Sequence, residues 1–485
     1  MMGKTVSTRL VPASTNGIVV ASCSIADLFS GKKVRASDNS LISGKLHLPE
    51  YQRPYRWGEA EVGRLLDDLR NYFEPAKGTL NPGYSFFLGS VILHQQDDAL
   101  LNIIDGQQRL TTMGLLAWMK KRGSEPDLSY ESPISRQKIR QNIAWLREQN
   151  FSLDSLDLRR VNIVLVVTHS EDDAYRFFET QNTGGVRLSG PDIIKAHHLR
   201  ATPRNRQDDF ARLWEGMGDL NPVVSAALKA RYWQALRFRE FPSHRQPQLI
   251  RSAVVDELAD RTGKDKGDIA YQQLTVTHTE DGRTQQDTQA GSYAMRQPLN
   301  AGVNTIHYLH YFESLRQQLR SHNKIAGLEP FHEFYQELIC KVEGCGYLKD
   351  LYDSCLLVYV SHFGQKKLYE FSLWLFRMVY SRRVTNKKTV KEDSVGALVR
   401  ESPVYDWILS SYIHEQCIKQ LKEFKVEVTP ENLGPDEKSV KKRFIEKVDA
   451  WFGLSLPNEQ LAQLYDEGLK GGIAKKVLDI GLSHE

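Results

Sequence analysis

The stretch Asn102 to Thr112, NIIDGQQRLTT, decides how the first part of the chain is expected to fold. An apolar run that begins at Leu100 has the length of a buried strand and ends at Asp105, and an apolar-periodic helix is predicted over 110–121. Gly106 lies between them and can take backbone conformations that other residues avoid. We therefore expect a strand that turns directly into a helix, whose first free N–H groups are suited to bind an anion.

The side chains around this turn are suited to phosphate chemistry. Arg109 carries a planar fork of donors that matches phosphate oxygens. Asp105 can hold Mg²⁺, directly or through water. The other polar side chains of the stretch add amide and hydroxyl groups: Gln107, Gln108, Thr111 and Thr112. The alternative is an ordinary strand–turn–helix joint, with Asp105 as a cap and Arg109 in a surface ion pair.

A second motif, LPEYQRPYRW, spans residues 48–57. Its two prolines favour an extended path. Arginines alternate with aromatic residues, a composition typical of sites that stack a base and bind a phosphate. The candidate side chains for base or DNA sensing are Tyr51, Gln52, Arg53, Tyr55 and Trp57. The alternative is a surface segment that is anchored by its aromatic rings.

A third motif, FFETQNTGGVRLSGPDIIK, spans residues 177–195. A helix is expected to run into a glycine turn, and a second helix begins with Ser189 as its N-cap and Asp192 three residues later. Asp192 and Lys195 lie on one face of that helix. Capping explains the serine and the aspartate, but it does not explain the polar residues on the exit turn, Asn182 among them. We therefore include Asn182, Asp192 and Lys195 among the candidate nucleotide-binding residues.

The three motifs, in this order, resemble the N-terminal domain of the GmrSD-type restriction family, which includes BREX-linked and phosphorothioate-sensing relatives. The resemblance covers roughly residues 20–200 and includes the strand motif FFLGSVIL. It implies a ParB/sulfiredoxin-like fold in which Gly106 to Arg109 hold nucleotide phosphates. It also implies nucleoside triphosphate hydrolysis that controls DNA restriction. For the Tyr51–Arg53 box, the resemblance leaves both base sensing and nucleotide binding open.

The rest of the chain predicts an α+β protein. Strands are expected over 84–94 and 161–168, and a helix over 59–73. After about residue 200 the strand signals fade and helical periodicity dominates. We predict an extension over 1–20, a ParB/sulfiredoxin-like domain with a small mixed sheet over 21–200, a mostly α-helical domain over 201–424 with a loop near 263–302, and a small helical subdomain over 425–485.

Composition excludes several classes of protein. The chain has 485 residues, a net charge of +4 and five cysteines without a CxxC pair, so disorder, a disulfide scaffold and a cysteine zinc site are not expected. No apolar run has the length of a membrane span, and the start does not read as a secretory signal, so a cytoplasmic protein without membrane contact is expected. The basic runs 381–391 and 438–447 are either solvated faces or, for the first, a DNA-backbone contact.

These observations predict an NTP-binding and NTP-hydrolysing subunit of a prokaryotic defence system that acts on foreign or modified DNA. Asp105, Gln107, Gln108 and Arg109 are the candidate catalytic residues, Asp105 is the Mg²⁺ ligand, and GTP is among the candidate nucleotides. The HNH motif of many family members is not found in the sequence, so a nuclease is expected from a partner subunit, and a homo-oligomer is possible. The alternatives are a nucleotide-gated DNA-binding adaptor that does not hydrolyse and, less favoured, a self-contained nuclease.

Overall fold

The computed structural model divides the chain into two compact units, Met1–Ala196 and His197–Glu485. The structure describes residues 18–74, 85–95, 99–120, 128–130, 132–149, 151–170, 173–174, 190–265, 267–270, 273–280, 283–290, 293–321, 325–387 and 389–481. Each unit is described by itself below.

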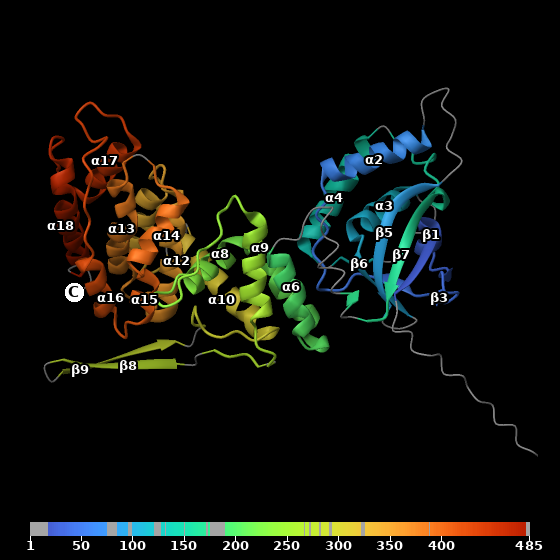
Figure 1. Cartoon of the computed structure of the whole chain (residues 1–485), viewed down its shortest axis with the longest axis horizontal. Helices are drawn as coiled ribbons and strands as arrows, with labels where there is room; N and C mark the ends of the chain where they lie inside the picture. Colours follow the sequence, from blue (N-terminus) through green and yellow to red (C-terminus); the bar gives the residue numbers. More distant parts are fainter. Residues whose placement is uncertain are drawn as a thin grey trace, which may run out of the picture. The chain divides into compact units, whose positions relative to one another are not determined.

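A five-stranded mixed sheet with the order β1-β7-β5-β6-β4 forms the centre of the first unit (Figure 1). The strands are β1 (Val19–Ser24), β4 (Lys45–His47), β5 (Phe86–Gln95), β6 (Leu100–Asp105) and β7 (Val161–Thr168). Neighbours β1/β7 and β5/β6 run antiparallel, whereas β5/β7 and β4/β6 run parallel. The three strands that the sequence predicts are confirmed; the short strands β1 and β4 were not predicted.

Apolar periodicity explains how the helices cover this sheet. Every second residue of β7 from Val161 to Val167 is fully buried, as expected for a strand with one face in the core. Helix α2 (Glu59–Phe73) has the predicted bounds, and its apolar side chains share one hydrophobic core with those of the sheet and of α3 (Gln107–Met119). The unit is completed by α1 (Ile25–Phe29), the β2–β3 ladder (Val34–Arg35 and Leu41–Ile42), α4 (Pro133–Glu148) and η1 (Leu158–Arg160).

The second unit is mostly helical, as predicted. Its helices are α7 (Gln207–Gly216), α8 (Asn221–Tyr232), α9 (Pro247–Val255), α10 (Val303–Arg320), α11 (Glu329–Phe334), α12 (Gly346–Phe363), α13 (Leu368–Thr385), α14 (Glu392–Glu401), α15 (Val404–Leu409), α16 (His414–Glu423), α17 (Val440–Phe452) and α18 (Leu461–Gly481). A 3-10 turn, η2 (Arg204–Arg206), precedes α7, and the π-helical turns η3 (Asp256–Asp260) and η4 (Tyr335–Ile339) extend α9 and α11. Helix α6 (Gly190–Ala201) spans the boundary between the units in the sequence.

The loop that the sequence predicts near 263–302 is corrected by the structure. Two strands, β8 (Gln273–Glu280) and β9 (Arg283–Ala290), pair here as an antiparallel hairpin, with Gln273 opposite Ala290. Threonine and valine recur in the first strand, but the many glutamines and flanking glycines hide this β propensity from a reading of composition.

Among the described residues, no helix is both long and apolar enough to cross a membrane.

Candidate functional site

The turn between β6 and α3 has the predicted form. Gly106 has φ 94° and ψ 0° and caps the helix, and the N–H of Leu110 donates to its carbonyl oxygen at 2.9 Å. A Cβ atom at Gly106 would lie 2.8 Å from Cγ2 of Val91, so both the backbone conformation and the available space require glycine. The first-turn amides of residues 107–109 have no acceptor within the helix and point out of its positive end.

Arg109 lies against strand β5. Its guanidinium donates to the carbonyl oxygens of Leu88 at 3.2 Å and Ser90 at 2.8 Å, and it pairs with Asp105 at 3.3 Å. Gly89 has φ 112°, and a Cβ there would lie 2.3 Å from the guanidinium, so the bulge of β5 is shaped around this side chain. The ion pair expected of an ordinary joint is therefore present, and Arg109 still retains 26% side-chain exposure beside the turn.

Gln52 connects the second motif to the end of β6. Its side-chain amide is buried and donates to the carbonyl oxygens of Ile103 at 2.9 Å and Ile104 at 2.8 Å. The ammonium of Lys195, which comes from α6 in the third motif, donates to the main-chain oxygen of Gln52 at 3.1 Å. The structure thus brings all three predicted motifs together at the carboxyl end of one strand.

Gln108 makes the reciprocal connection from α3. Its side-chain oxygen accepts from the main-chain N–H groups of Arg56 at 2.8 Å and Trp57 at 3.1 Å, and its amide donates to the oxygen of Pro54 at 3.3 Å. The side chain is buried and occupied on both of its polar ends. This geometry assigns Gln108 to positioning the second motif, and these contacts do not favour the catalytic role that the sequence predicts for it.

Three hydroxyl side chains predicted as ligand contacts lie in the protein interior instead. Tyr55 is fully buried, and its hydroxyl contacts Thr112 Oγ1 at 2.8 Å and accepts from Asn142 at 3.0 Å. Burial raises the pKa of Tyr55 above its ordinary value. Thr111 is also buried and contacts the hydroxyl of Tyr130 at 2.6 Å. The expected base contact of Tyr55 and nucleotide contacts of both threonines do not fit this packing.

Charged side chains gather around the turn. Arg56 pairs with Asp192 at 3.2 Å. Burial lowers the pKa of Arg53, whose charge also interacts with Asp192, Arg56 and Asp105. With Arg109 and the buried Lys195, four cationic side chains face two carboxylates, so the site has an excess of positive charge. This balance favours a ligand with two or more negative charges.

Gln107 has a side-chain oxygen without a hydrogen-bond partner in the described part of the chain. Its side chain is buried, and no described residue donates a hydrogen bond to its Oε1 atom. A buried polar atom without a partner costs free energy, and such atoms in native proteins call for an explanation such as a water or ligand. The residue is the first of α3, directly after Gly106. Gln107 is therefore the amide of this motif whose oxygen has no partner among the described residues.

Of the remaining predicted site residues, Tyr51 and Trp57 are described by the structure and Asn182 is not. Tyr51 and Trp57 are half-buried, and Trp57 packs against the hydrophobic core while its carbonyl oxygen accepts from Asn142 at 2.8 Å. Asn182 lies outside the described residues. Sequence reasoning did not assign Arg56 or Asn142 to the site. The alternation within the second motif pointed to Arg56, whereas nothing in the sequence marked Asn142.

The side chains at the turn supply only some of the ligands that a Mg²⁺ ion needs. Within the described ranges, no group of three histidine, cysteine or acidic side chains is arranged to hold a metal ion. Asp105 is one-third exposed and offers carboxylate oxygen, the kind of ligand that Mg²⁺ prefers, but it shares its charge with Arg109. One or two carboxylates together with phosphate oxygens form a usual Mg²⁺ site, so the residues fit the ion when a nucleotide supplies the other ligands.

Comparison with known families agrees with this arrangement. Residues 25–199 match the family model of the GmrSD restriction endonuclease N-terminal domain. The first unit carries a GmrSD-type domain. The resemblance inferred from the three motifs is thereby confirmed, and it gives the GmrSD-type domain a role related to restriction systems.

The second unit matches a different model. Residues 206–435 match a family of unknown function, DUF7834, and no HNH domain is detected in the chain beside the GmrSD-type domain. The search of curated proteins found no match.

Proposed function

We propose that the GmrSD-type domain binds a nucleoside triphosphate, with its phosphates at the Gly106 turn, and hydrolyses it. The observation that carries this proposal is the meeting of the three motifs at one strand end. There, the first turn of a 13-residue helix, whose first amides have no acceptor within the helix, is surrounded by more cationic than acidic side chains. Backbone amides and arginines together form the usual protein environment for phosphate.

Each side chain has a task that follows from its position. The first-turn amides and Arg53 would hold phosphate oxygens, and Arg109, fixed on β5, would stabilise charge that develops on them. The unpartnered oxygen of Gln107 would accept a hydrogen bond from the attacking water and orient it. Mg²⁺ held by Asp105 and the phosphates would neutralise phosphate charge. GTP and other nucleoside triphosphates remain candidates.

The test uses Gln107→Met, because no described hydrogen bond is made by the oxygen that this change removes. We expect nucleotide affinity to stay within a few-fold of wild type, while phosphate release falls by about 100-fold, the cost of one lost catalytic contact. Arg53→Ala should weaken nucleotide binding itself. Arg64→Ala, on an exposed arginine of α2, is the control and should leave both measurements unchanged. Equal phosphate release by wild type and Gln107→Met would remove the hydrolytic assignment.

In the cell, we propose that the chain acts in defence against foreign or modified DNA. A separately encoded HNH nuclease would cut the DNA, the chain itself would sense it in the cytoplasm, and a homo-oligomer would be compatible with this role. The restriction-type domain and the lack of a detected HNH domain support this division of labour. Co-purification with the product of a neighbouring reading frame, followed by plasmid cleavage with and without it, tests the partner.

One observation favours a second candidate, a nucleotide-gated DNA-binding adaptor without turnover. The Arg109 guanidinium already has three acceptors in the protein, so it is held in place rather than free to follow a reacting phosphate. Saturable nucleotide binding without phosphate release, together with a change in DNA affinity on adding nucleotide, would establish the adaptor.

A further inference from the structure

The segment between α8 and α9 in the second unit is strongly basic. From Arg231 to Arg251 the chain carries five arginines and a single acidic residue, Glu240, so these 21 residues have a net charge of +4. The whole chain of 485 residues also has a net charge of +4. The basic runs 381–391 and 438–447 carry net charges of +5 and +4, so this segment is one of three strongly basic stretches. Its residues 233–246 form neither helix nor strand.

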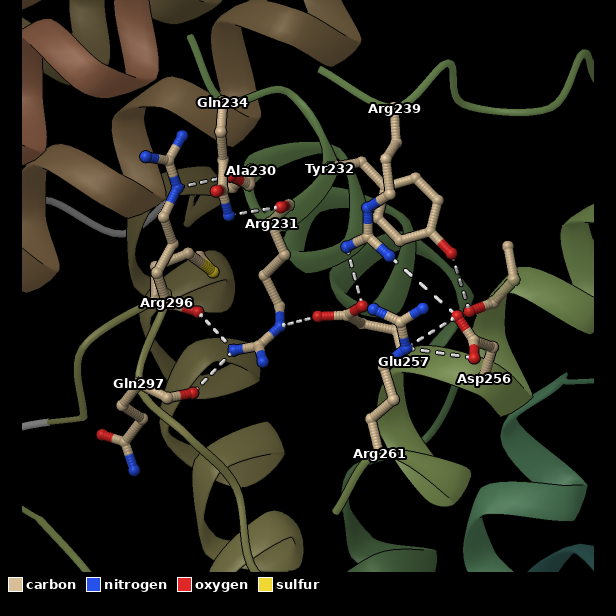
Figure 2. A network of polar contacts seen from close by, with 12 residues as sticks. Ala230, Arg231, Tyr232, Gln234, Arg239, Asp256, Glu257, Arg261, Arg296 and Gln297 are labelled. Atoms are coloured by element: carbon tan, nitrogen blue, oxygen red, sulfur yellow. Dashed lines mark hydrogen bonds and ion pairs between the residues drawn. The ribbon is translucent and has the colours of Figure 1, made fainter. Parts of the chain in front are cut away.

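A buried carboxylate fixes the start of this segment. Glu257, in the π-helical turn η3, is buried and accepts from Arg231 and Arg239 at 2.8 Å each (Figure 2). The Arg239 guanidinium lies 3.7 Å from the centroid of the Tyr232 ring. A π-helical turn of this kind is uncommon and is frequent at functional sites. Two arginines of the segment are thus used for the fold itself.

Two further carboxylates bind other parts of the segment. Asp406 accepts from the main-chain N–H of Ala235 at 2.7 Å and from Arg296 at 2.6 Å. Glu392 accepts from the hydroxyl of Ser243 at 2.9 Å and from the main-chain N–H of His244. The segment is therefore held at three points in one irregular path. A fixed surface loses less conformational entropy when it binds a partner than a mobile loop does.

This fixed path presents arginines and an apolar side chain to solvent, together with one exposed carboxylate, Glu240, which lies 4.0 Å from Arg400. Arg237 and Arg245 are exposed, and within the described part of the chain neither side chain forms an ion pair. Leu236, next to the first of them, is 97% exposed. The guanidinium of Arg400, from α14, lies 4.6 Å from the ring centroid of Phe238 in the same segment. Exposed arginines that are not paired with carboxylates are the groups by which proteins neutralise the phosphates of a nucleic-acid backbone.

Several side chains of the basic runs 381–391 and 438–447 are engaged with other parts of the protein. Lys441 and Lys442 are buried, and their ammonium groups donate to carbonyl oxygens of residues 429–435. In the other run, Arg382 pairs with Glu401 and Lys387 pairs with Glu431. Two lysines of the 438–447 run are thus occupied inside the protein, and two cations of the 381–391 run are paired with carboxylates, Lys387 at an exposed position. The structure therefore favours the arginine segment over these two basic runs as a polyanion-binding surface.

We propose that residues 235–245 form a DNA-binding surface, with Arg237 and Arg245 on backbone phosphates and Leu236 against the sugar edge. This proposal rests on the proposed function only in its choice of DNA as the polyanion. It assigns a binding role to the part of the chain that matches a family of unknown function.

The experiment measures the affinity of the full chain for a short labelled DNA duplex across a series of salt concentrations. We expect Arg237→Ala with Arg245→Ala to weaken binding by roughly tenfold and to reduce the salt slope by about 2, one unit per lost phosphate contact. The control combines Arg212→Ala with Lys475→Ala, which removes the same net charge from two exposed positions elsewhere in the second unit. It should bind as wild type does.

The outcomes separate this surface from the nucleotide site. An equal loss in both double variants would show a dependence on net charge alone and overturn the surface. So would wild-type affinity in the Arg237/Arg245 variant, or stronger loss of RNA binding than of duplex binding. Phosphate release is measured on the same preparations. Normal phosphate release together with unchanged DNA affinity in the Arg237/Arg245 variant would overturn the DNA-binding surface and leave the proposed NTP hydrolysis standing. Wild-type phosphate release with unchanged DNA binding in Gln107→Met would overturn the proposed hydrolysis and leave the DNA-binding surface standing.

Discussion

Two glycine residues show how closely the backbone at this turn is packed against neighbouring side chains. Gly106 and Gly89 both have positive φ, and in each case a Cβ atom would collide with a neighbouring side chain. The first contact is with Val91 in the core, and the second is with the guanidinium of Arg109. The cradle for the proposed phosphates therefore depends on two glycines, one within β5 and one at the start of α3.

We expect Gly106→Ala to lower the free energy of unfolding by about 2–4 kcal/mol, because a left-handed backbone costs about 1–2 kcal/mol and overpacking against Val91 adds a similar amount. Urea unfolding followed by fluorescence measures this change. Gly31→Ala is the matched control: it also has positive φ, 67°, but a Cβ there meets nothing within 4 Å. A cost for Gly106→Ala no larger than that of the control would show that the contact with Val91 is unimportant.

At the scale of elements, the beginning of α17 is held by lysines rather than by an acidic partner. Lys441 and Lys442 lie in the first turn, and both fold back onto carbonyl oxygens of the preceding segment. Burial, and to a smaller extent the charge of Arg383, lower the pKa of Lys441 to about 8. Sequence reasoning assigned this run to a solvated face, because a run of lysines gives no sign of which ammonium groups the fold will bury.

This burial predicts a pH dependence. Between pH 8 and about 10, the unfolded chain holds the Lys441 proton more tightly than the folded chain, so the free energy of unfolding should rise with pH in that interval. Below pH 8 both states are protonated and this contribution is flat. In Lys441→Met the rise should be smaller by about 1–2 kcal/mol, as measured by urea unfolding at each pH. Identical pH profiles for the two proteins would contradict the lowered pKa.

At the scale of the whole molecule, a buried ion pair attaches the last helix to the helical unit. Arg377 of α13 is buried and forms a two-point pair with Asp466 of α18, each contact 2.7 Å, while also donating to the carbonyl oxygen of Leu421. Because the guanidinium stays charged, removing its carboxylate leaves an uncompensated buried cation.

We therefore expect Asp466→Ala to destabilise the protein by about 3–5 kcal/mol and to expose α18 to proteolysis and amide exchange before the other helices. Limited proteolysis with mass spectrometry locates the first cleavage. Glu467→Ala is the control, since Glu467 is the adjacent residue, is 74% exposed, and pairs with Lys470 at an exposed position. Protection of α18 equal to wild type in Asp466→Ala would show that its apolar packing is sufficient.

The sequence alone determined the features that depend on neighbours along the chain. The β6–Gly106–α3 joint, the bounds of α2 and the helical second unit follow from spacing, apolar periodicity and glycine chemistry within a few residues. The GmrSD-type domain was predicted from the resemblance of its three motifs to that family. Only the tertiary structure decided which polar groups remain available. Gln52 and Gln108 are chemically identical to Gln107, yet partners more than 50 residues away occupy both of them. Gln107 Oε1 has no hydrogen-bond partner in the part of the chain that the structure describes. Hydrophobic periodicity predicts which face of a helix or strand is buried, but it does not predict which residues that face contacts.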